Sequence, residues 1–228
     1  MSLLHVADLH VRIGGSHILQ GVSFEVADTG VTALLGRNGA GKTTTLRAVL
    51  GLVPRTGTVR FAGADLAGLR TDQVVRRGIG YAPEDRGVFA GLTVAENLRL
   101  AERDRRPRYD LVYALFPELR QRSRQPAGTL SGGQQQMVAI ARTLLNDNRM
   151  LLVDEPTKGL APKVVTEVAA VLERAATTVP ILLVEQNLGL VRRLTDRVVL
   201  LAQGRVAHTG ALPEDPDRLH SLLGVGTS

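Results

Sequence analysis

The sequence predicts a single α/β domain spanning residues 1–228, with a mostly parallel sheet at its core. Short, continuous apolar runs are typical of parallel strands that are buried on both faces. Such runs occur at residues 31–35, 150–153, 181–184 and 198–202. Segments with helical spacing lie between the runs, and this alternation favours a sheet with right-handed crossovers. Polar–apolar alternation near the N-terminus adds a small antiparallel β layer on that side.

The N-terminal layer is expected to contain at least three strands. Residues 3–13 form the first. Val22, Phe24 and Val26 give the second strand one apolar face, and a turn at 28–30 ends it. Residues 58–61 are expected to complete the layer as an edge hairpin.

An α-helical lobe is expected to be inserted into the core over about residues 85–145. Most of this stretch has helical character, and its last helix is predicted at 137–145. Thr93, with Glu96 three residues later, reads as a capping box at a helix start.

Two further helices are expected towards the C-terminus. Apolar residues at helical spacing follow Pro162 and predict a helix between the strands at 150–153 and 181–184. A weak, short helix is expected after Gly210, with Pro213 and Pro216 at its start.

A phosphate-binding loop connects the strand at 31–35 to a helix predicted at 44–50. It reads Gly36-Arg37-Asn38-Gly39-Ala40-Gly41-Lys42-Thr43-Thr44, a G-x-x-x-x-G-K-T pattern. Its backbone N–H groups and the helix N-terminus can surround an anion. Lys42 supplies positive charge to the β- and γ-phosphates, and Thr43 a hydroxyl for Mg²⁺. A plain glycine turn before a helix would explain neither side chain.

Two carboxylates follow the strand at 150–153. At the end of a buried strand, Asp154 is suited to hold Mg²⁺ through water, and Glu155 to polarise the water that attacks the γ-phosphate. Many strands end in an acidic residue, so this pair alone is a weak indication of a catalytic site. Together with the phosphate-binding loop it becomes a strong one.

A second anion-binding helix start precedes the helix at 137–145. It reads Leu130-Ser131-Gly132-Gly133-Gln134-Gln135-Gln136. An ordinary N-cap would need neither two glycines nor three glutamines. Because only one set of lysine and metal groups is present, the economical explanation is that this segment completes the site of a second copy.

The order of these motifs resembles the ATP-binding cassette family over essentially the whole chain. The resemblance implies an ATPase that uses ATP and Mg²⁺. It also implies a head-to-tail dimer, in which each ATP lies between the Lys42 loop of one cassette and Ser131, Gly132, Gly133 and Gln134 of the other. ATP binding would close this dimer, and hydrolysis with product release would open it.

Finer features are similar to two subfamilies. The segments Gly159-Leu160-Ala161-Pro162, Val184-Glu185-Gln186-Asn187 and Pro83-Glu84 resemble ATPases of branched-chain amino acid uptake systems. Residues 14–19 and the glutamines at 134–136 instead resemble those of urea and short-amide systems. Both substrates remain open at this point.

Three site positions depart from most cassettes. Gln186 replaces a histidine and cannot titrate, so we expect it to be a neutral γ-phosphate sensor beside the water-activating Glu155. Glu84 replaces a glutamine and is expected near Mg²⁺, the alternative being that it faces solvent. Ile13 replaces an aromatic that stacks on adenine, unless His10 or Val11 takes that role through a register shift.

Composition limits the partners. The net charge is +6, and the densest basic run, 103–108, is interleaved with acidic residues as in a solvated loop. Aromatic residues make up 3%, so base-stacking platforms are not apparent and nucleic acid is not an expected partner. The chain has no cysteine, which excludes disulfides and thiolate zinc sites. Neither a signal peptide nor an apolar run long enough to span a bilayer is apparent.

The family resemblance implies an ATP-hydrolysing importer subunit, peripheral on the cytoplasmic face of the inner membrane. Its expected partners are integral membrane permease subunits that dock near residues 84–98, a second identical or sister ATPase, and indirectly a solute-binding protein. A soluble cassette acting on ribosomes or DNA is a weaker alternative, supported only by the basic charge. A P-loop kinase is weaker still, since it has no role for the segment at Ser131.

Overall fold

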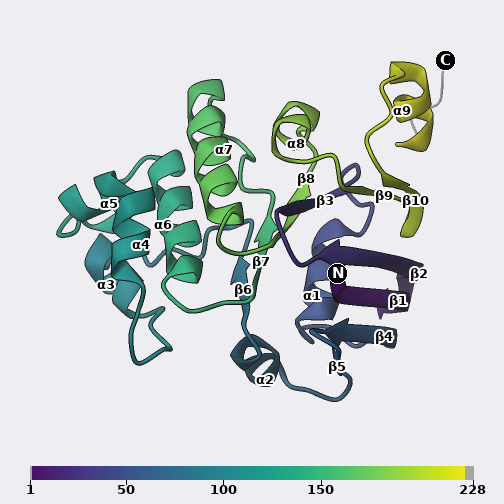
Figure 1. Cartoon of the computed structure of the whole chain (residues 1–228), viewed down its shortest axis with the longest axis horizontal. Helices are drawn as coiled ribbons and strands as arrows, with labels where there is room; N and C mark the ends of the chain where they lie inside the picture. Colours follow the sequence, from purple (N-terminus) through teal and green to yellow (C-terminus); the bar gives the residue numbers. More distant parts are fainter. Residues whose placement is uncertain (1, 224–228) are drawn as a thin grey trace.

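The structure, a computed structural model, describes residues 2–223 and confirms the α/β architecture (Figure 1). The larger sheet has six strands in the order β10-β9-β3-β8-β7-β6. β10 runs antiparallel to β9, whereas the other neighbouring pairs are parallel. The strands are β3 (Val31–Leu35), β6 (Ile79–Ala82), β7 (Met150–Asp154), β8 (Ile181–Glu185), β9 (Val198–Ala202) and β10 (Arg205–Gly210). Met1 and residues 224–228, the two ends of the predicted domain, lie outside the described residues.

Burial of both faces explains the continuous apolar runs. Every residue of β3, β7 and β8 is buried. Along β7, Met150 and Leu152 pack in the apolar cluster that includes α1 (Lys42–Val49), whereas Leu151 and Val153 pack in the cluster that includes α7 (Pro162–Ala176). Successive strand residues point to opposite faces, so each face needs its own apolar residues and the usual alternation disappears.

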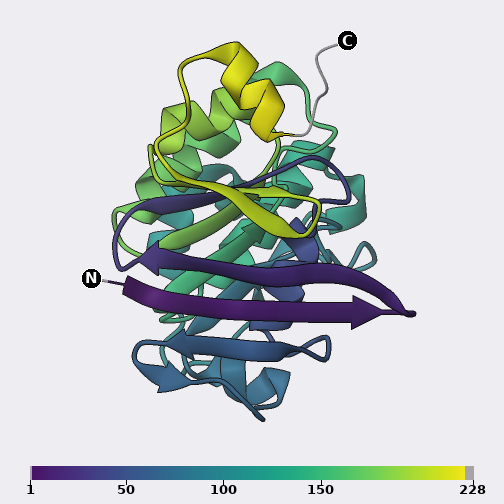
Figure 2. The same ribbon diagram turned by 90° about the vertical axis from the view of Figure 1, so that its right-hand side faces the viewer.

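A four-stranded antiparallel sheet forms the second layer, in the order β2-β1-β4-β5. Its strands are β1 (Ser2–Ile13), β2 (Ser16–Ala27), β4 (Thr56–Phe61) and β5 (Ala64–Asp65). Figure 2 shows β1 and β2 as long neighbouring strands. Helix α1 lies between the two sheets, where its apolar residues join those of both (Figure 1).

The expected edge hairpin at residues 58–61 is present: β4 pairs with β5, and β5 takes the outermost position. Ala62 and Gly63 both have positive φ, 50° and 81°, which is the backbone of a tight hairpin turn. The turn folds Ala64 and Asp65 back onto β4, and this short strand takes the edge.

The helical stretch between β6 and β7 is broken into several short helices. Thr93 and Glu96 form the predicted capping box at the start of α3. Helix α6 begins at Gly132 and not at 137, because Ser131 caps it. The helices not yet given are α2 (Thr71–Arg76), α3 (Val94–Arg99), α4 (Tyr109–Leu115), α5 (Pro117–Gln121), η1 (Ala127–Thr129), α6 (Gly132–Leu144), α8 (Leu188–Leu194) and α9 (Pro216–Leu222).

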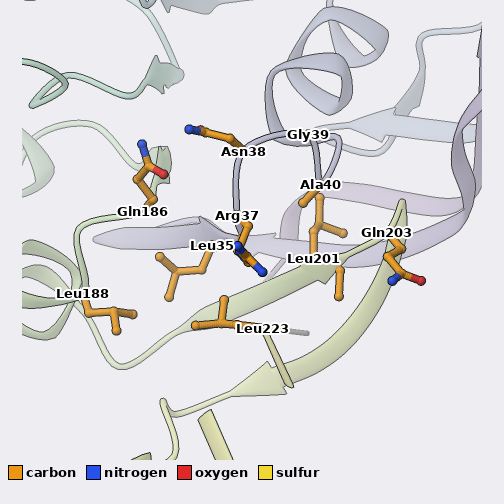
Figure 3. A pocket seen from close by; sticks show the side chains of 12 residues that line it. Leu35, Arg37, Asn38, Gly39, Ala40, Gln186, Leu188, Leu201, Gln203 and Leu223 are labelled. Atoms are coloured by element: carbon orange, nitrogen blue, oxygen red, sulfur yellow. The ribbon is translucent and has the colours of Figure 1, made fainter. Parts of the chain in front are cut away.

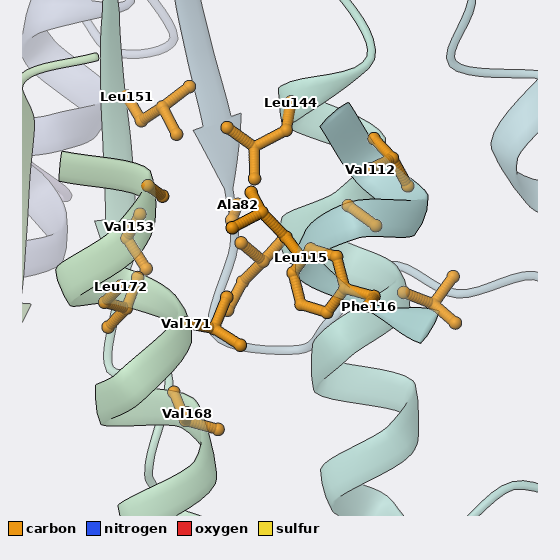
Figure 4. Packing of buried hydrophobic residues seen from close by; sticks show 14 of the residues in the cluster. Ala82, Val112, Leu115, Phe116, Leu144, Leu151, Val153, Val168, Val171 and Leu172 are labelled. Atoms are coloured by element: carbon orange, nitrogen blue, oxygen red, sulfur yellow. The ribbon is translucent and has the colours of Figure 1, made fainter. Parts of the chain in front are cut away.

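Helices α3 to α6 pack on the face of the large sheet that α7 also covers. Figure 4 shows Leu115 and Phe116 facing Val171 of α7, in the same cluster as Leu151 and Val153 of β7. None of the helices within residues 2–223 is long and apolar enough to cross a membrane.

Gly57 in β4 must be a glycine because the backbone of β1 passes close to its Cα atom. Gly57 has φ +91°, and a Cβ there would lie 2.1 Å from the backbone oxygen of Asp8, at an irregularity of β1. We expect Gly57→Ala to lower the free energy of unfolding by about 2–4 kcal/mol, since backbone strain and overpacking add. Urea denaturation measures this.

The control for Gly57 is Gly63→Ala. Gly63 has a similar φ of +81°, but a Cβ added there would meet no other atom within 4 Å. Only the backbone cost of about 1–2 kcal/mol applies there. Equal losses in the two variants would show that the Asp8 contact is unimportant.

Candidate active site

The loop between β3 and α1 lines a cavity of about 580 Å³. Figure 3 shows Arg37, Asn38, Gly39 and Ala40 around it, with Gln186 beside Asn38. The loop after β8 thus faces the predicted phosphate-binding loop. This follows from the strand order, because β3 and β8 are neighbouring parallel strands whose carboxyl ends meet at one edge.

Lys42 joins this loop to the carboxylates after β7. Its side chain is only 3% exposed, and its Nζ donates to the backbone oxygens of Gly36 at 2.8 Å and Arg37 at 3.2 Å. The same ammonium lies 3.0 Å from Oε1 of Glu155. A buried ammonium thereby neutralises a buried carboxylate, and both sit where the sequence predicted a triphosphate.

Asp154 is held by two hydroxyl groups. Thr43 Oγ1 donates to Oδ1 at 3.1 Å, and Tyr81 from β6 donates its hydroxyl to Oδ2 at 3.3 Å. Burial, with a smaller contribution from the neighbouring charges of Glu155 and Glu84, raises the pKa of Asp154 to about 6, although the two hydrogen bonds oppose this shift. A cation beside Asp154 would relieve this cost.

The oxygen donors at Asp154 fit Mg²⁺. Thr43 and Asp154 supply a hydroxyl and a carboxylate, which are hard ligands of the kind this ion prefers. Residues 2–223 contain no group of three or more His, Cys, Asp or Glu side chains placed to hold a metal.

Glu155 is the point at which three elements meet. It is 5% exposed and has φ +43°, a strained backbone of the kind that persists at functional sites. Lys42 approaches one carboxylate oxygen, and Gln186 Nε2 donates to the other at 3.4 Å. Lys158, from the loop after β7, lies 3.6 Å from that second oxygen.

Glu84 pairs with a lysine to which the sequence motifs give no role. Lys158 Nζ donates to Oε1 of Glu84, which follows β6, and so bridges Glu84 and Glu155. Glu84 is partly exposed at 37%, so it lies at the rim of the site. Tyr81 was missed as well, because β6 is only four residues long and contains a glycine, which hides the strand.

The segment at Ser131 is separate from the Lys42 loop within one chain. Ser131 caps α6, and it exchanges backbone and side-chain hydrogen bonds with Gln134 at 3.1 and 3.3 Å. Ser131, Gly133 and Gln134 line a different cavity, which shares no residue with that of the Lys42 loop. Packing also favours glycine at position 133, since a Cβ there would lie 2.2 Å from Val164 Cγ1.

Ile13 lies at the end of β1 and is 46% exposed. It does not line the cavity of the Lys42 loop. Of the two alternatives by register shift, Val11 is buried at 1% and has no free surface for a base. His10 stacks on His17, with ring centroids 5.4 Å apart.

Comparison with known proteins identifies the family. The family model described as ABC transporter matches residues 19–158. The chain is 40% identical over 207 residues to the high-affinity branched-chain amino acid transport ATP-binding protein BraG of Pseudomonas aeruginosa, covering 87% of this chain and 89% of BraG. It is 36% identical over 220 residues to the probable branched-chain amino acid transport ATP-binding protein LivF of Archaeoglobus fulgidus, covering 93% of each.

The fold agrees with a solved cassette. A nucleotide-free ATP-binding cassette from an ABC transporter superposes with a TM-score of 0.82 and 25% identity, over 97% of this chain and 96% of that one. Sequence motifs, fold and relatives therefore agree, and the chain belongs to the ABC transporter family as an ATP-binding ATPase of this class.

Proposed function

We propose that this chain is the ATP-binding and hydrolysing subunit of an importer for branched-chain amino acids. The observation that carries the proposal is the convergence of Lys42, Asp154, Glu155 and Gln186 on one edge of the sheet, from three neighbouring strands. The substrate class is supported by the BraG and LivF relatives. Urea or short-amide uptake with the same ATPase is the alternative.

The residues of the site divide the chemistry among them. Lys42 and the N–H groups of its loop would bind the β- and γ-phosphates, and Lys42 would leave Glu155 to do so. Glu155 would then accept a proton from the attacking water, which Gln186 helps to orient by its amide. Thr43 and Asp154 would hold Mg²⁺, which neutralises phosphate charge when bound.

Glu84 is proposed to lie beside Mg²⁺ and to report the state of the nucleotide. Its ion pair with Lys158 supports this, because Lys158 also reaches Glu155. A cation entering among these carboxylates would compete with Lys158 for both of them.

The site is proposed to be completed by a second cassette, either identical or a sister chain. Ser131 is exposed at the start of α6, so its side chain is accessible to the nucleotide of a partner. The dimer would bring this helix start to the γ-phosphate, where its dipole favours negative charge.

Permease subunits are proposed to dock along the exposed side of β6, which places the protein on the cytoplasmic face of the inner membrane. A hollow of about 340 Å³ lies there, bordered by Tyr81, Arg86, Ala101 and Arg142. Phe89, half exposed beside Arg142, offers an apolar contact at its rim. This hollow overlaps the region 84–98 expected from the sequence.

Transport in a reconstituted system tests this function. The chain would be purified with its permease subunits, placed in proteoliposomes, and supplied with the solute-binding protein of the same system. We expect leucine, isoleucine or valine to stimulate ATP hydrolysis severalfold. Stimulation by urea or short amides alone would favour the alternative, and hydrolysis that no permease affects would contradict a transport role.

Nucleotide selectivity is expected to be weak. An adenine placed against Ile13 would receive only aliphatic contact, so ATP and GTP should bind with dissociation constants within a few-fold in calorimetry. Ile13→Tyr should raise ATP affinity about 2- to 10-fold, the range of one aromatic stacking interaction. A large ATP preference in the unmodified protein would place the base against another residue.

A further inference from the structure

Glu185 is a buried carboxylate to which the reaction described above gives no role. It is the last residue of β8 and only 1% exposed. Among residues 2–223 no lysine, arginine or histidine forms an ion pair with it. A buried charge without a counter-ion is expensive, so its hydrogen bonds must hold it.

The two oxygens of Glu185 serve two different loops. Oε1 accepts from Thr157 Oγ1 at 2.5 Å and from the Thr157 backbone N–H at 3.3 Å. Oε2 accepts from the backbone N–H groups of Gln186 at 2.9 Å and Asn187 at 3.0 Å. One carboxylate thus ties the loop after β7 to the loop after β8.

Each of these loops carries a residue of the hydrolytic site. Thr157 lies two residues after Glu155, and Gln186 follows Glu185 directly. The side chains of Gln186 and Glu155 meet through a single hydrogen bond of 3.4 Å, which is too long to set their separation, and the Glu155 backbone N–H donates to Val184 of β8 at 2.9 Å. Glu185 accepts four hydrogen bonds, one from the Thr157 hydroxyl and three from backbone N–H groups, and these are better placed to fix the separation of the two loops.

Packing alone does not explain an acid here. The preceding residues of β8, Ile181 to Val184, are apolar and fully buried, and a further apolar residue would fill the space at a lower cost of desolvation. What an apolar residue cannot do is accept hydrogen bonds from both loops at once.

We propose that Glu185 is a positioning residue for ATP hydrolysis, which fixes Glu155 and Gln186 relative to each other by bridging their loops. The inference rests on the proposed function of that site. It concerns the chemical step only, because none of the hydrogen bonds of Glu185 reaches the Lys42 loop.

Glu185→Gln is the first test, since the amide keeps the shape but cannot accept from both loops. In the permease complex we expect kcat to fall about 10- to 100-fold, while KM and the directly measured Kd for ATP stay within about 2-fold. Glu173→Gln is the control, because it makes the same change at the exposed Glu173–Arg193 pair and should leave kcat unchanged.

Thr157→Val is the second test, and it still decides the question if Glu185→Gln does not fold. It removes one hydroxyl without changing the shape of the side chain. We expect kcat to fall with constant KM, and the double variant to be no slower than Glu185→Gln alone, because both changes break the same bridge. Full additivity, a normal kcat in the variant that folds, or a parallel loss of kcat, ATP affinity and melting temperature would overturn the proposal.

Hydrogen exchange provides a measurement that needs no activity. In the isolated chain, the amides of Thr157, Gln186 and Asn187 should exchange faster in Glu185→Gln than in the unmodified protein. If the unmodified complex hydrolyses no ATP, the proposed function fails while this measurement still decides whether the bridge exists. Unchanged protection at all three amides would show that it does not.

Discussion

Replacing Glu155 with Gln is expected to lower the rate of ATP hydrolysis by about 10²- to 10⁴-fold, the usual contribution of a positioned general base. The amide has the shape of the carboxylate but cannot take a proton from water. ATP binding should persist, because the variant also frees Lys42 from its 3.0 Å ion pair and leaves the ammonium to the phosphates. Single-turnover hydrolysis at saturating Mg·ATP measures the loss, and equilibrium binding of a fluorescent nucleotide measures what remains.

Gln186→Ala serves as the comparison for Glu155. Gln186 contributes one long hydrogen bond to Glu155 and has no titratable group, so its loss should slow turnover by less than about 10-fold. Near-normal hydrolysis by Glu155→Gln, or a greater loss in Gln186→Ala, would move the water-activating role away from Glu155.

Mixing two inactive variants is expected to restore ATP hydrolysis. Lys42→Ala removes the ammonium that binds phosphate, and Ser131→Arg places a bulky side chain on the exposed start of α6. In a mixed dimer one composite site carries both defects and the other carries neither. An equimolar mixture of independent sites should therefore recover up to about a quarter of the unmodified activity.

The mixing experiment separates a shared site from a self-contained one. Each variant alone should be inactive in the permease complex, and activity should appear only when both are present. Recovery would fail if each chain completed its own site, since no subunit in the mixture would then be intact. Should the working dimer contain a sister ATPase, Lys42→Ala and a change at the Ser131 equivalent of the sister fall on the same composite site, so combining them should lower activity no further than either change alone.

Much of the fold was accessible from the sequence because its strongest signals are local. The runs at 31–35 and 150–153 are apolar throughout because both faces of the sheet are covered. The phosphate-binding loop is likewise a continuous segment, and so its strand, loop and helix could be placed together. β6 escaped because it is short and contains Gly80, and its identity as a strand comes from pairing with β7.

The contacts between loops were not accessible in the same way. Lys158 and Glu84 are separated by 74 positions, and Thr157 and Glu185 by 28. Their meeting depends on strand order, in which β7 lies between β6 and β8. A sequence pattern can indicate that a strand ends in an acidic residue. Which loop donates hydrogen bonds to that residue depends on which strand lies beside it in the sheet. The Glu185 bridge is therefore visible only in three dimensions.

The strand directions also leave one side of the molecule free for the attachment of a spectroscopic probe. Lys42, Glu155 and Gln186 all follow the carboxyl ends of their strands, so the turns at the opposite ends carry no part of the site. Thr29 is exposed in such a turn, two residues before β3. Because the chain has no cysteine, Thr29→Cys would provide its sole thiol, and a dye attached there would report cassette movements without touching the nucleotide.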